Sequence, residues 1–305
     1  MRGLLRRLFV DPEPTKVAVE VRPRAVGVVR VSHDGTRPAL AAAASMELAE
    51  GALRLSAIES NVVDGAALRA TLRSACERAG VPGGTRISLV LPDPVARITL
   101  LPAAEAKARS EAESQELIRF RLKRTLPFEA REARVAFRPE GETVLVVAAA
   151  PAVLDPYEDA CRACGLVPGI VELAGVALFD AVRASRPPSD RLIVNWDDGY
   201  ASLLLTVGGA PALARTLVGP AAESPEELLR ELQSTLLYYG ERLAGAGLVG
   251  VTLRSAAGAK PDPEAWLEGA LGLPVEPVDV WMRAEARLPA QGLAGAAASL
   301  FRRVA

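Results

Sequence analysis

The stretch that decides the fold is Arg191-Leu-Ile-Val-Asn-Trp-Asp-Asp-Gly-Tyr-Ala-Ser-Leu-Leu-Leu-Thr-Val207. Two apolar runs, 191–196 and 201–207, flank Asp197-Asp-Gly199, and an Asp-Gly turn between such runs predicts a β-hairpin. A third strand is expected at 212–217. The hairpin follows Ser185-Arg-Pro-Pro-Ser-Asp190, the strongest linker in the chain. Residue 191 therefore opens a second structural unit that begins with three successive strands.

The first half of the chain begins in the same way, with expected strands at 17–21 and 25–31 joined by Arg22-Pro-Arg24. Two halves that each start with a β-meander and then add helices and strands are the duplicated pattern of the actin-like nucleotide-binding superfamily, in which phosphates lie between two hairpin turns. We therefore predict an α/β, actin-like (ribonuclease H-like, duplicated) fold with two lobes, 16–190 and 191–305. A small α+β subdomain is inserted at about 85–160, residues 1–15 form a basic segment and spacer, and the second lobe ends in a C-terminal helix.

Local patterns predict further elements. Asp64 caps a helix over 65–78, and Ser224 opens a helix over 226–243 with a capping box. Residues 52–58 are expected as a strand and 290–303 as the terminal helix. A charged helical stretch covers 103–123, although its last part alternates with a period of two and on local pattern alone fits a strand.

The composition excludes several classes of function. The 305 residues carry 36 Lys+Arg and 37 Asp+Glu, a formal net charge of −1, which argues against a protein that coats nucleic acid. The single histidine, His33, is expected in a turn and excludes multi-histidine metal sites. Three cysteines fit a reducing compartment, and the Cys161-Arg-Ala-Cys164 pair has too few further ligands for zinc, so we interpret it as packing residues.

No apolar run approaches the ~20 residues that span a bilayer, and the N-terminus lacks a signal-peptide core. The basic segment Met1-Arg-Gly-Leu-Leu-Arg-Arg-Leu-Phe-Val10 allows two interpretations. It forms a short interfacial helix, with Arg2 and Arg6 at the lipid headgroups and Leu5 and Phe9 inserted, or it is a frayed or locally packed terminus. The second is favoured, because so short a helix is marginal alone.

Four stretches carry a resemblance to a known family. They are Glu116-Leu-Ile-Arg-Phe-Arg-Leu-Lys-Arg-Thr-Leu-Pro-Phe128, Cys164-Gly-Leu-Val-Pro-Gly-Ile-Val-Glu-Leu173 with Ala177-Leu-Phe179, Leu228–Tyr239, and Gly292-Leu-Ala-Gly-Ala296. The order and spacing of these four stretches together make the chain resemble PilM, the actin-like cytoplasmic protein of type IV pilus assembly, over residues ~16–300. The resemblance assigns 118–123 to a helix. The related cytoplasmic domain of type II secretion has the same general plan.

The resemblance implies a cytoplasmic scaffold, peripheral to the inner membrane, that binds the cytoplasmic N-terminal segment of a PilN-like membrane protein in a groove beside the inserted subdomain. Other pilus inner-membrane proteins are further candidate partners. The basic and apolar residues suited to that groove are Arg119, Phe120, Arg121, Lys123 and Phe128. The residues alone favour a solvated helix face, because several glutamates lie nearby. No nucleic-acid partner is expected.

The family's two phosphate turns resemble D-I-G-S-S-S and D-I-G-x-x-x-T. The matching stretches here are Glu20-Val-Arg22-Pro-Arg-Ala25 and Asn195-Trp-Asp197-Asp198-Gly199-Tyr-Ala201, with Ser255-Ala-Ala-Gly258 on the adenosine side. Proline removes a donor, asparagine replaces the metal-orienting aspartate, and a carboxylate stands where glycine faces phosphate. We therefore predict a degenerate nucleotide site with no metal, no catalytic residue and no certain cofactor. Its remaining residues are Glu20, Arg22, Asn195, Asp197, Asp198, Gly199 and Gly258.

The alternatives stay open. If Asp197 and Asp198 recruit Mg²⁺ in a rearranged turn, the chain is an Mg-ATP-binding assembly ATPase of the same family. A small-molecule kinase of the same superfamily would need intact phosphate loops and a catalytic aspartate in the cleft between the lobes, and we find neither. The simplest interpretation of Asp197-Asp-Gly199 is a polar β-turn.

Overall fold

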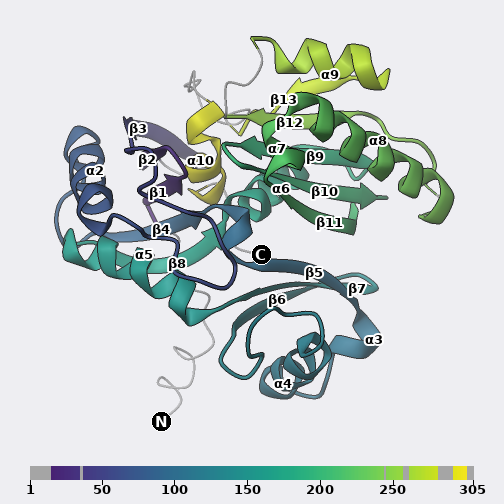
Figure 1. Cartoon of the computed structure of the whole chain (residues 1–305), viewed down its shortest axis with the longest axis horizontal. Coiled ribbons are helices and arrows are strands. Elements are labelled where there is room, and N and C mark those ends of the chain that lie inside the picture. Colours follow the sequence, from purple (N-terminus) through teal and green to yellow (C-terminus); the bar gives the residue numbers. More distant parts are fainter. Residues whose placement is uncertain (1–14, 35–36, 244, 257–260, 281–290, 301–305) are drawn as a thin grey trace.

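Two five-stranded sheets form the two lobes in the computed structural model, which describes residues 15–34, 37–243, 245–256, 261–280 and 291–300. Their strand orders match: β3-β2-β1-β4-β8 in the first lobe and β11-β10-β9-β12-β13 in the second. In each sheet the first three strands are antiparallel, and the last two add in parallel. The predicted two-lobe, duplicated α/β fold is confirmed (Figure 1).

The strands of the first sheet are β1 (Val17–Arg22), β2 (Ala25–Asp34), β3 (Arg37–Glu47), β4 (Arg86–Leu91) and β8 (Val167–Leu173). Those of the second are β9 (Arg191–Asp197), β10 (Tyr200–Val207), β11 (Ala210–Val218), β12 (Val251–Ser255) and β13 (Val275–Pro277). The central strands β1 and β9 are buried along nearly their whole length, because helices or the opposite lobe cover both faces.

The helices cover the sheets and cross between the lobes. Helix α6 (Ala174–Ser185) belongs to the first half of the chain, but its Phe179 packs against Ile193 of the second sheet. Helix α10 (Ala294–Leu300) returns from the second half and packs Ala297 against Val29 of the first sheet. Each lobe is therefore completed by a helix from the other half. The remaining helices are α2 (Gly65–Arg78), α5 (Pro151–Ala163), α7 (Pro220–Glu223), α8 (Pro225–Arg242) and α9 (Pro263–Leu271), with 3-10 turns η1 (Asp93–Val95) and η2 (Gln291–Leu293).

A small subdomain lies between β4 and β8 in the sequence; the ends of the expected range 85–160 belong instead to the first lobe, because β4 is in its sheet and α5 packs in its core. It is a three-stranded antiparallel sheet of order β5-β7-β6, made of β5 (Arg97–Pro102), β6 (Arg134–Glu140) and β7 (Thr143–Ala149). The charged stretch forms two helices, α3 (Ala103–Ala106) and α4 (Glu111–Leu122), because the Ser110 side chain caps a new helix by accepting from the N–H of Glu113. Ile118 and Leu122 pack on β7, so the helix at this point is confirmed.

Two local predictions are wrong. Residues 52–58 are not a strand and contribute only an isolated bridge between Leu53 and Val62. The third strand of the meander is β3, whose alanine-rich sequence has weak strand propensity and is held by its pairing with β2. His33 lies in strand β2, paired with Pro38, rather than in a turn.

Candidate functional site

Two hairpin turns, one from each lobe, meet at the centre of the molecule. Each hairpin closes over a two-residue turn, so Arg22 at the end of β1 and Asp197 at the end of β9 occupy equivalent positions in the duplicated fold. Glu20 and Asn195, two residues earlier, point to the same face of their strands, because side chains alternate along a strand. The structure thus brings together four of the residues that the sequence singled out for a nucleotide site.

These turn residues bind each other. Arg22 donates to Asp197 from Nε (2.8 Å) and Nη2 (2.7 Å), a bidentate ion pair between the lobes. The same Nη2 also donates to the carbonyl oxygen of Ala256 (2.9 Å). The Asp197 side chain is fully buried and that of Arg22 is 9% exposed.

A second arginine completes the network. Arg254, at the end of β12, is fully buried and uses all three of its guanidinium nitrogens. Nη2 donates to Glu20 (2.6 Å), Nη1 to the side-chain oxygen of Asn195 (2.8 Å), and Nε to the carbonyl oxygen of Gln291 (2.9 Å). The other carboxylate oxygen of Glu20 accepts from the backbone N–H of Ala296 at 2.8 Å. This ties α10 to β1 and β12.

Asp93 is the third buried carboxyl group of this site, after Asp197 and Glu20. It follows β4 in η1 and accepts from the side-chain amide of Asn195 (2.8 Å) and the backbone N–H of Gly175 (2.7 Å). A Cβ at Gly175 would lie 2.5 Å from the Asp93 carboxylate, so only glycine lets the start of α6 come this close.

The pKa values of the three acids differ because their positive partners differ. Burial alone would raise the pKa of Asp197, but the hydrogen bonds from Arg22 and the charge of Arg254 outweigh burial and hold that pKa below its ordinary value. Burial dominates for Glu20 and for Asp93 and raises the pKa of both. Two guanidinium groups do not fully compensate three carboxyl groups.

The geometry does not fit a triphosphate with Mg²⁺ between these turns. Phosphate needs free N–H donors, yet Arg22 and Arg254 already donate to carboxylates and carbonyls of this chain. Pro23 has no N–H, and the N–H of Asp198 donates to the Asp197 carboxylate at 2.8 Å. Among the described residues, no group of three or more His, Cys, Asp or Glu side chains is arranged to hold a metal ion.

The predicted nucleotide site has three further residues, Asp198, Gly199 and Gly258. Asp198 and Gly199 form the turn of the second hairpin, where Gly199 has a φ of 72°, as a primed Asp-Gly turn requires. Gly258, like Arg2, Leu5, Arg6 and Phe9, lies outside the described residues.

Sequence reasoning missed Arg254 and Asp93. Asp93 follows the apolar strand β4, and Arg254 lies near the end of the apolar strand β12. A charged residue between buried neighbours indicates a buried partner. Neither partner could be named, because the strands that carry them meet only in the folded chain.

The residues proposed for partner binding do not share one surface. Helix α4 packs on the face of the small sheet formed by Val144, Val146 and their neighbours. Phe120 on this helix is 71% exposed, Arg119 pairs with Glu116, and Arg121 pairs with Glu105. Phe128 instead packs against the core of the first lobe.

A small apolar groove of about 190 Å³ lies on the other face of that sheet, between the subdomain and the first lobe. β6 and β8 border it, and each is the last strand of its sheet. Ala136, Val147, Leu154 and Val171 line the groove, with Arg134 and Glu158 beside them.

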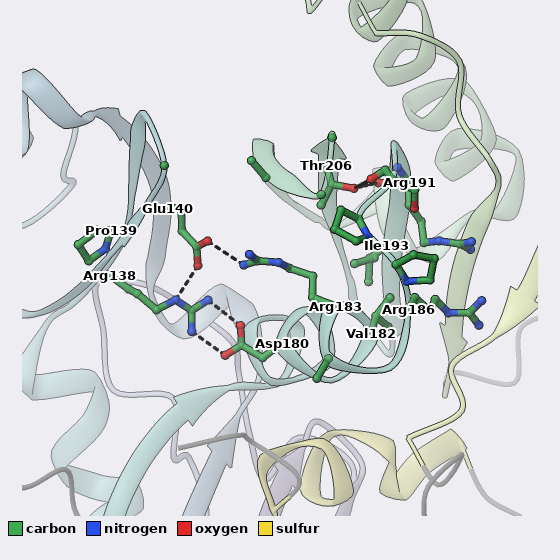
Figure 2. Close-up of a pocket in the computed structure, with 18 of the residues that line it drawn as sticks. Arg138, Pro139, Glu140, Asp180, Val182, Arg183, Arg186, Arg191, Ile193 and Thr206 are labelled. Atoms are coloured by element: carbon green, nitrogen blue, oxygen red, sulfur yellow. Dashed lines mark hydrogen bonds and ion pairs between the residues drawn. The ribbon is translucent and has the colours of Figure 1, made fainter. Parts of the chain in front are cut away.

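A larger cavity of about 860 Å³ separates the far end of β6 from α6 and the second sheet. Figure 2 shows Arg138 and Glu140 facing Asp180 and Arg183 across it. Arg138 makes a bidentate pair with Asp180 (2.6 and 2.8 Å), and Arg183 pairs with Glu140 (2.8 Å). These pairs join the subdomain to α6 and fix the subdomain's position.

The cysteines are packing residues rather than a redox pair. Cys161 is buried and burial raises the pKa of its thiol to about 12, while Cys164 sits at the helix C-terminus and donates to the carbonyl oxygen of Arg69. None of the described helices combines the length and apolar character that crossing a bilayer needs.

No protein-family model and no curated protein matches the chain. Solved structures do. The PilM-PilN type IV pilus biogenesis complex aligns with a TM-score of 0.74 and 21% identity over 95% of this chain and 97% of that chain. The cytoplasmic domain of EpsL, an inner-membrane component of the type II secretion system of Vibrio cholerae, aligns with a TM-score of 0.52 and 11% identity over 93% and 92%. A protein of unknown function with an actin-like ATPase fold from Bacteroides thetaiotaomicron aligns with a TM-score of 0.51 and 12% identity over 87% and 91%. The chain therefore has the actin-like ATPase fold, in a form similar to that of PilM.

Proposed function

We propose that this chain is a non-catalytic cytoplasmic scaffold of type IV pilus assembly or a related secretion system, peripheral to the inner membrane. It binds the cytoplasmic N-terminal segment of a PilN-like membrane protein in the groove between β6 and β8. The observation that carries the proposal is this groove, bordered by two edge strands, in a fold that aligns with PilM over nearly its whole length.

Edge strands offer unpaired backbone N–H and C=O groups, which an extended peptide can bind as an added strand. The apolar lining of the groove would take alternate side chains of that strand, and the charges of Arg134 and Glu158 at its border would orient polar groups. The ion pairs between Arg138 and Asp180 keep the subdomain in place, so the groove exists before the peptide binds.

The test is fluorescence anisotropy with a labelled synthetic peptide of the N-terminal cytoplasmic tail of the PilN-type protein from the same genome. Ala136 is exposed, faces the groove and makes no core contact, so Ala136→Arg should fill the groove without unfolding the chain. We expect at least tenfold weaker peptide binding. Ala41→Arg is the matched control, because Ala41 is an exposed alanine on β3, the edge strand at the opposite side of the first sheet.

The paired substitution Phe120→Ala with Lys123→Ala examines the face of α4. If the groove is the site, this variant binds the peptide like the unmodified chain. If it loses binding while Ala136→Arg does not, the α4 face is the docking surface and the groove assignment is wrong. Absence of binding to the unmodified chain would reject the proposed function.

A further inference from the structure

We propose that the buried ion network is a clasp that holds the two lobes together in place of a nucleotide, so that this chain closes without ATP or ADP. The clasp consists of Arg22, Glu20, Asp197 and Arg254. This proposal does not depend on the identity of the peptide partner.

The position of the clasp follows from the duplication. Arg22 and Asp197 end equivalent strands, and their side chains bond to each other across the lobes. At this point a guanidinium from one lobe meets a carboxylate from the other, with two parallel N–H···O bonds. The second pair, Arg254 with Glu20, runs in the opposite sense: the cation comes from the second lobe and the anion from the first. Two crossed pairs resist both separation and sliding of the lobes.

The charges of this network disfavour the binding of phosphate between the turns. Each of the three guanidinium nitrogens of Arg254 already donates to an acceptor of this chain. The side chains of Asp197 and Glu20 are 0% and 1% exposed. A triphosphate placed between the turns would add negative charge beside three buried carboxyl groups and would need both guanidinium groups to leave them. Leaving a buried carboxylate unpaired strongly destabilises the folded chain.

The network also secures α10. Gly295 lies so close to Glu20 that an added Cβ would come within 2.6 Å of its carboxylate, and Ala296 donates to the same group. The clasp therefore links β1, β9, β12 and α10, which are the elements around the centre of the molecule.

The first test uses the unmodified chain. Titration with Mg-ATP and Mg-ADP by calorimetry should give no binding heat at millimolar nucleotide. Hydrogen exchange at the N–H groups of Asp198 and Ala296, which donate to Asp197 and Glu20, should be slow without nucleotide and unchanged by it. Micromolar binding, or exchange that slows only when Mg-ATP is added, would overturn the proposal.

The second test is a double-mutant cycle with Arg22→Met and Asp197→Leu. Each single substitution leaves a buried charge unpaired and should lower the folding equilibrium constant on the order of 10²- to 10⁴-fold. The double substitution should cost at least tenfold less than the product of the two. The exposed pair of Arg230 with Glu227 is the control and should couple by less than about fivefold. Independent effects at Arg22 and Asp197 would contradict the clasp; if a single variant does not fold, the nucleotide titration still decides.

Discussion

At the residue scale, the arginines at the centre of the molecule explain why the lobes meet as they do. A buried guanidinium stays charged and brings several N–H groups that need acceptors. Arg254 finds three, from β1, β9 and η2, and therefore specifies the relative position of these elements as well as neutralising a charge. The net stability of such a pair relative to an apolar one is small, but removing one partner is costly.

This leads to a pH-dependent prediction for Asp197→Asn. The folded pKa of Asp197 lies below its unfolded value of about 3.9, so its contribution is present above that pH and is lost as the pH falls. At pH 7 the variant should lose about 3–5 kcal/mol of unfolding free energy, because Arg22 loses the carboxylate with which it forms its bidentate pair. The difference from the unmodified chain should shrink as the pH falls below about 4.

Urea denaturation at neutral pH and in acid measures both values. Asp155→Asn is the control: its carboxylate is 49% exposed in a surface pair, and its removal should change stability by less than about 1 kcal/mol at either pH. A constant difference for Asp197→Asn across this range would mean that folding does not lower the pKa of Asp197, which would contradict its charge pairing with Arg22. Glu20 and Asp93 act in the opposite direction, since their raised pKa values favour the folded state as the pH falls.

At the element scale, patterns that act over a few residues were enough for most helices. Asp64 and Ser224 cap α2 and α8 where the sequence places them. The predictions failed where pairing partners decide: β3 is a strand because β2 lies beside it, and 52–58 is not a strand because no neighbour continues its ladder. The position of helix α10 likewise depends on its tertiary contacts.

The packing of α10 gives a prediction for Gly295→Ala. Replacing a helical glycine by alanine usually adds about 0.5–1 kcal/mol of stability. At Gly295 the new methyl group would instead meet the Glu20 carboxylate at 2.6 Å, and we expect a loss of about 1–3 kcal/mol. Gly269→Ala in α9 is the matched control. A Cβ added at Gly269 would meet no atom within 4 Å outside the adjacent turns of its own helix, so this substitution should be neutral or stabilising. Thermal unfolding of both variants distinguishes the two effects, and equal behaviour would show that α10 does not press on Glu20.

At the scale of the whole molecule, the exchanged helices make the lobes interdependent. Phe179 of α6 is fully buried between the halves, against Ile193 and Leu204 of the second sheet. The start of the same helix is tied to the first lobe by the bond from Gly175 to Asp93. A change in this helix should therefore reach both sheets.

Phe179→Ala tests that coupling. The variant should lose about 3–5 kcal/mol, as expected for a large buried aromatic side chain. Hydrogen exchange should show that the amides of β1 and β9 lose protection together, since unfolding of one lobe exposes the other. Lower protection of β9 alone, with β1 unchanged, would mean that the lobes unfold as separate units.

The sequence by itself determined the duplicated order of elements, most helix boundaries and the unusual residues of the two turns, because strand alternation, caps and turn residues act locally. It also placed Arg22 and Asp197 in the two turns of one expected site. Only the tertiary structure decided that these two residues bind each other, that Arg254 and Asp93 join them, and that α4 and the groove lie on opposite faces of one sheet. Such contacts join residues far apart in the sequence, 234 positions for Glu20 and Arg254, and depend on how the lobes pack.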